Sequence, residues 1–169
     1  FVLDELAHVE LCARVANQLG GGVALRYDAR ALVPVADGEF SPLGRAAQLI
    51  LEVNCVSETF LLAMQRHNRR EHRNKLVRAV LASITRDEAA HARFGWVFFE
   101  WADPLLGACE RVRLRARAAA AVAAHLPTSV PRGAPRETLG WMSERQYREV
   151  AIGVMEDAVC APLRRRGLL

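Results

Sequence analysis

Hydrophobic positions recur every three or four residues along most of this chain, which is the period of an amphipathic α-helix. The pattern predicts five helical segments, at about residues 1–19, 41–66, 70–101, 105–125 and 143–163. We find no stretch with the strict alternation of apolar and polar residues that is typical of a β-strand. The sequence therefore predicts an all-α fold.

Local signals mark the ends of these segments. The serine and proline at 41–42 form a good helix start, and the aspartate and proline at 103–104 form a helix stop. Three glycines at 20–22 end the first segment, and the residues up to 40 predict a long connection. A stretch containing Pro and Gly, 126–136, separates the last two helices.

Length and composition describe a globular chain that forms one domain. It has 169 residues, of which 51% are hydrophobic and 25% are charged. A chain of this size buries about 70% of its unfolded surface, so it needs no disulfide or metal to fold. The four cysteines lie far apart in the sequence, at Cys12, Cys55, Cys109 and Cys160. This spacing argues against a zinc ribbon and against a disulfide scaffold. We therefore expect the protein in a reducing cytoplasm.

The net charge of +4 gives little information about partners, because the basic residues are spread over several segments. A polar turn between two helices explains the basic cluster between His67 and Arg73, so we expect no nucleic-acid partner. No run of 18 uninterrupted apolar residues occurs, and no signal-peptide pattern opens the chain. We therefore expect no membrane association.

The pattern Asp-Glu-x-x-His occurs twice, at residues 4–8 and 87–91. A Glu and a His three residues apart lie on one face of a helix, so both can reach the same metal ion. The pairs are Glu5 with His8 and Glu88 with His91, and both fall on otherwise apolar stripes. A carboxylate on such a stripe needs a cation or hydrogen-bonding partners, which a divalent metal would supply.

One more carboxylate fits this description. Glu58 shares an apolar face with Leu51, Asn54 and Leu62, whereas Glu52 points about 120° away by the helical period and is expected at the surface or beside the site. Cys12, one turn beyond His8, has two interpretations: a small core residue, which we favour, or a group near the metal.

In these residues the chain resembles the ferritin-like carboxylate di-iron family, whose four-helix bundle holds two metal ions with one Glu on each of two helices and a Glu-x-x-His on each of the other two. The resemblance covers about 100 residues, with Glu5, His8, Glu58, Glu88 and His91 as ligands and residues 20–40 in the place of the family's long crossover. It implies a ferritin-like bundle within residues 1–103, extended by helices in residues 104–169.

The resemblance leaves one ligand without a counterpart, the lone Glu of the first bundle helix. The chain opens at Phe1 within a helical pattern, so we expect that helix upstream; a partner chain, as in a homodimer, or the loss of one metal are alternatives. Asp4 and Asp87 are expected to support the site, Asp4 by a hydrogen bond to His91 and Asp87 by one to His8.

The function that the resemblance implies is an oxidase or oxygenase that uses two ions, iron or alternatively manganese, to activate O₂ for attack on a small organic substrate. Two alternatives stay open: a ferroxidase or iron-handling protein, and a non-catalytic helical bundle with a degenerate metal site.

Overall fold

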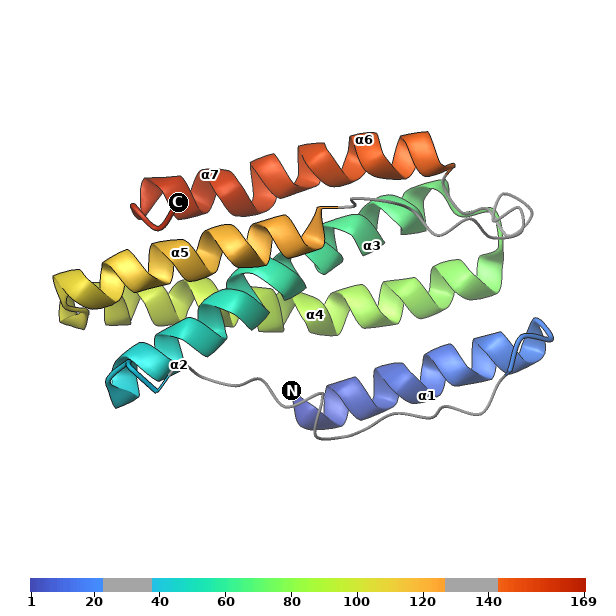
Figure 1. Cartoon of the computed structure of the whole chain (residues 1–169). Helices are drawn as coiled ribbons and strands as arrows, with labels where there is room; N and C mark the ends of the chain where they lie inside the picture. The colour runs from blue at the N-terminus through green and yellow to red at the C-terminus, as the bar shows by residue number, and fades with distance from the viewer. Residues whose placement is uncertain (23–37, 127–142) are drawn as a thin grey trace.

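A computed structural model of the protein describes residues 1–22, 38–126 and 143–169, and every regular element in these ranges is a helix (Figure 1). The α-helices are α1 Val2–Gln18, α2 Pro42–Ile50, α3 Thr59–Glu71, α4 Lys75–Ala102, α5 Ala108–His125, α6 Glu144–Val154 and α7 Ala161–Arg165. Wider π-helical turns join α2 to α3 over Leu51–Glu58 and α6 to α7 over Met155–Cys160. The described helices thus line up as five rods, and the predicted all-α class is confirmed.

The five predicted segments correspond to these rods, with shifted ends. The rod expected to end near residue 66 continues to Glu71, and α4 begins at Lys75 instead of residue 70. Asn74 sets this start, because its Oδ1 accepts hydrogen bonds from the backbone N–H groups of Leu76 at 2.9 Å and Val77 at 3.3 Å. Most of the two predicted connections lies outside the described residues.

Four rods pack around one apolar core: α2–α3, α4, α5 and α6–α7 (Figure 1). α2–α3 and α5 run in one direction, and α4 and α6–α7 run in the other. The fully buried side chains come from all four rods and include Leu51, Val56, Phe99, Leu114, Met155 and Leu163. The helices that follow residue 103 therefore share the core with those that precede it.

α1 lies outside this core, alongside α4 (Figure 1). His8 is its buried residue, and apolar side chains such as Leu3 point to the surface, with 79% of Leu3 exposed. Cys12 and Leu19 are exposed and Val15 is half-buried, so the apolar stripe that continues from Glu5 and His8 lies outside the core, and the favoured placement of Cys12 in the core is wrong. The helix packs mainly against a single neighbour, which leaves much of its surface open.

The rod Pro42–Glu71 is long and apolar enough to cross a membrane by length and composition, with a mean hydropathy of 1.3 over an 18-residue window. Half of that window is buried inside the fold, and the rod packs against α4 and α5. A core helix of a bundle has the same composition. Its place in the core accounts for the apolar character of this rod.

The π-helical turns of Leu51–Glu58 approach α4 closely at Gly95. A Cβ atom at this glycine would lie 2.8 Å from Asn54 Cβ, 2.8 Å from Cys55 Sγ and 3.1 Å from Cys55 N. Cβ atoms essentially never come within 3.0 Å of a non-bonded heavy atom, so a side chain here would displace Asn54 Cβ and Cys55 Sγ, and glycine sets the spacing of the two rods. His91 lies one helical turn away, and the same spacing positions it.

We predict that Gly95→Ala lowers the free energy of unfolding by about 1–3 kcal/mol, because Asn54 Cβ and Cys55 Sγ must move away from the added methyl group. Urea denaturation measures the change. Gly153→Ala is the matched control: this helical glycine is exposed, and an added Cβ meets no atom within 4 Å, so stability should stay equal or rise by about 0.5–1 kcal/mol. Equal unfolding midpoints for the two variants would contradict the close approach.

Candidate metal centre

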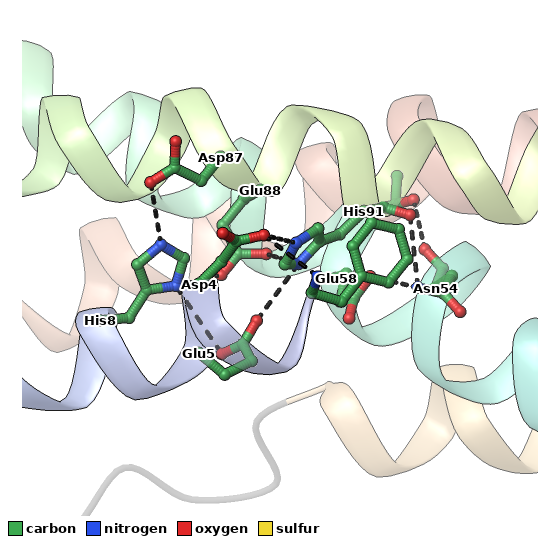
Figure 2. Close-up of polar contacts among 10 residues, drawn as sticks. Asp4, Glu5, His8, Asn54, Glu58, Asp87, Glu88 and His91 are labelled. Atoms are coloured by element: carbon green, nitrogen blue, oxygen red, sulfur yellow. Dashed lines mark hydrogen bonds and ion pairs between the residues drawn. The ribbon is translucent and has the colours of Figure 1, made fainter.

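Three rods, one of them α4, bring acidic and imidazole side chains together in one place (Figure 2). α1 supplies Glu5 and His8, the last π-helical position supplies Glu58, and α4 supplies Glu88 and His91. One potential ligand atom from each of Glu5, Glu58, Glu88 and His91 lies within 4.8 Å of the others. The structure therefore brings the predicted residues into one cluster, while metal binding by them stays a prediction.

The two histidines turn their Nδ1 atoms toward the same two carboxylates (Figure 2). His8 Nδ1 lies 3.1 Å from Glu88 Oε1 and 3.7 Å from Glu5 Oε2. His91 Nδ1 lies 3.2 Å from Glu5 Oε1 and 3.3 Å from Glu88 Oε2. Each of Glu5 and Glu88 thus directs one oxygen to each imidazole, which divides the cluster into two poles.

The other ring nitrogen of each histidine contacts an aspartate on the opposite helix. His8 Nε2 lies 3.3 Å from Asp87 Oδ2, and His91 Nε2 lies 3.0 Å from Asp4 Oδ2. These are the two cross-helix contacts predicted from the repeated Asp-Glu-x-x-His pattern, and both are confirmed. An aspartate that accepts a hydrogen bond from Nε2–H holds the neutral ring in the tautomer whose Nδ1 carries a lone pair. This is the form of histidine that binds a metal.

Asn54 positions Glu58. Its side-chain amide donates to Glu58 Oε2 at 2.5 Å and to the backbone carbonyl of His91 at 3.3 Å, so it joins the third carboxylate to α4. The sequence predicts Asn54 on an apolar face but assigns it no role. The signal in the sequence was an amide side chain four residues before the lone glutamate, on the same apolar face. π-Helical turns such as those before Glu58 recur at functional sites.

Burial and mutual repulsion shape the charge of the cluster. Burial raises the pKa of Glu88 and of Glu58, and the negative charge of Glu5 raises both further. Burial lowers the pKa of His91, but the hydrogen bond to Asp4 and the charges of Glu88 and Glu58 outweigh it, so this pKa is raised overall. The cluster therefore attracts protons, which stand in for positive charge that the protein itself does not provide.

A divalent cation fits this donor set. The Nδ1 atom of His8 is buried and has no hydrogen-bond partner, although carboxylate oxygens of Glu88 and Glu5 face it. Only 7% of the His8 side chain and 1% of the His91 side chain are exposed. Water therefore has little access to serve as a hydrogen-bond partner of these imidazoles. Mixed carboxylate and imidazole ligands suit iron, manganese or zinc.

The structure also separates the two acidic residues of the π-helical turns. Glu52 Oε1 accepts hydrogen bonds from Gln48 Nε2 at 3.1 Å and from Arg117 Nε at 2.6 Å. Glu58 faces the cluster instead, as the helical period predicts. Cys12 is exposed and does not belong to the group of potential ligands found among the described residues.

We predict that Asp87→Asn weakens metal binding by about 10–100-fold, because the amide no longer fixes the imidazole of His8 with its lone pair toward the carboxylates. Titration with Mn²⁺ followed by electron paramagnetic resonance measures the affinity. The control is Asp157→Asn, an exposed aspartate on the far rod, which should leave the affinity unchanged. Unaltered binding by Asp87→Asn would contradict the role of this aspartate.

We also predict that a divalent ion slows hydrogen exchange of the α1 amides by about tenfold or more, because the cluster links this helix to α4 and the helix contributes nothing to the core. Mass spectrometry of protein with and without Mn²⁺ provides the rates. The amides of α5 serve as the internal reference, since that helix packs in the core and should not respond. Equal α1 rates in both samples would show that docking does not depend on the ion.

Comparisons with known proteins do not assign this site. No protein-family model, no curated protein and no solved structure matches the chain. The chemistry of the site therefore has to be argued from its own residues.

Proposed function

We propose that this protein binds two divalent ions, iron or alternatively manganese, between α1 and α4. The observation that carries the proposal is the buried, unpartnered Nδ1 of His8, which faces carboxylate oxygens of Glu5 and Glu88. Two atoms that both accept hydrogen bonds repel each other at this distance unless a cation or a proton lies between them. A metal ion satisfies the imidazole and both carboxylates at once.

The two poles of the cluster define two positions of unequal strength. One pole has His91, Glu58 and one oxygen each from Glu5 and Glu88, whereas the other has His8 and the remaining oxygens of the same two glutamates. Three carboxylates balance three of the four charges of two divalent ions. We expect the first ion to bind at His91 and the second, more weakly, at His8, with a further carboxylate or water completing the second position.

The order and direction of the rods support a ferritin-like bundle. The ligand patterns appear along the chain as Glu-x-x-His, Glu and Glu-x-x-His, in α1, before α3 and in α4. α1 and α2–α3 run in the same direction and α4 runs in the opposite one (Figure 1). The long crossover of the family likewise joins two helices that run in the same direction.

The activity that we propose is oxidation or oxygenation of a small organic molecule with dioxygen. When bound, two reduced iron ions supply electrons to dioxygen. The protein side chains prepare the site: Asp4 and Asp87 fix the tautomers of the imidazoles, and Asn54 holds the Glu58 carboxylate in place. The cytoplasm is the compartment in which we expect this chemistry.

Anaerobic titration with Fe²⁺ followed by addition of O₂ tests the proposal. We expect about two bound equivalents, in two steps, and consumption of O₂ without growth of a mineral core. Glu58→Gln should abolish the tighter step, whereas Glu52→Gln, a change in the same π-helical turns but directed at Arg117, should leave both steps intact.

Three results would contradict parts of this proposal. Binding of well under one equivalent under reducing conditions would leave a helical bundle without a metal site. Equal binding by Glu58→Gln and Glu52→Gln would place the ion elsewhere. Formation of an iron mineral instead of turnover of an organic substrate would make the protein a ferroxidase or iron-handling protein.

A further inference from the structure

The turn between α3 and α4 concentrates the positive charge of the molecule. Residues 66–78 contain six arginine and lysine side chains and one acidic side chain, Glu71. This local excess is greater than the net charge of +4 of the whole chain, so the remaining residues together carry no positive excess. Basic residues occur in several segments, but the surplus of positive charge lies where α3 ends and α4 begins.

Four of these cations line a groove of about 640 Å³ between the two helices. Arg69 and Arg70 come from the last turn of α3, and Lys75 and Arg78 come from the first turn of α4. Small side chains of Ala79 and Ala82 form the rest of the lining. Across residues 1–22, 38–126 and 143–169, none of these four cations forms an ion pair with a carboxylate.

Helix electrostatics explain only half of this arrangement. Arg69 and Arg70 lie at the C-terminal end of α3, where the helix dipole favours positive charge. Lys75 and Arg78 lie at the N-terminal end of α4, where the dipole disfavours cations, and no acidic residue occupies that first turn. Cations placed against both the dipole and one another create a positive potential that attracts anions, and no carboxylate of the described residues forms an ion pair with them.

We propose that this groove binds a small phosphorylated compound with at least two phosphate groups. Arginine forks bind phosphate oxygens in pairs, and lysine adds a mobile point charge. The lining contains no aromatic side chain, so it offers no surface for stacking the bases of a single-stranded nucleic acid. The site is distinct from the metal centre, because Arg78 precedes Glu88 by about 15 Å along the axis of α4.

Calorimetric titration of the full chain with inorganic pyrophosphate tests this inference. The buffer contains about 0.15 M salt, to screen weak surface attraction, and a chelator, so that pyrophosphate does not bind through a metal ion. We expect saturable binding of one pyrophosphate per chain, and binding of orthophosphate at least about tenfold weaker. The double variant Arg70→Gln, Lys75→Gln should lose at least about tenfold in affinity.

Both substituted side chains belong to exposed residues, so the variant should fold, which circular dichroism verifies. Arg145→Gln is the matched control: its side chain is 85% exposed, it lies in the first turn of another helix, and its removal should not change the affinity. Absence of saturable binding, or equal affinity of the double variant and the unmodified chain, would overturn the inference. Tighter binding of a single-stranded RNA or of anionic lipid vesicles than of pyrophosphate would also overturn it.

Discussion

Three carboxylates crowded beside two imidazoles need positive charge to balance them, and this constraint bears on the arrangement of α1. Glu5, Glu58 and Glu88 approach one another closely, and burial, together with the charge of Glu5, raises the pKa of Glu58 and of Glu88. α1 contributes no side chain to the apolar core. Polar contacts of the cluster and the packing of Phe1 on His91 and Phe94 hold it on α4, and the strength of the polar contacts depends on how the charge of the cluster is balanced.

Periodicity and motif spacing predicted much of the fold and of the site. Five helical segments, the selection of Glu58 over Glu52, and the pairing of Asp87 with His8 all follow from the helical period and from the symmetry of the repeated pattern. These features are local or involve two copies of the same local arrangement. Side chains three or four residues apart keep their relation in any straight helix, so the sequence specifies them.

Other features depend on packing that a single sequence does not display. The π-helical turns of Leu51–Glu58 widen the helix without breaking its hydrophobic pattern, and Asn54 gains its role only because α4 lies within reach. Cys12 is exposed because the helix that carries it has α4 as its main neighbour. Amphipathic spacing shows that a helix has an apolar face, but it does not show whether another element covers that face.

If the cluster binds metal as proposed, the separation of the core from α1 implies an order of assembly. Glu58, Glu88 and His91 all belong to rods that the core already holds together, whereas Glu5 and His8 arrive on a helix outside it. A first ion captured by the preassembled trio would act as a template on which the N-terminal helix folds, and that helix would then close the second position. Maturation would proceed in the order bundle, ion, closing helix.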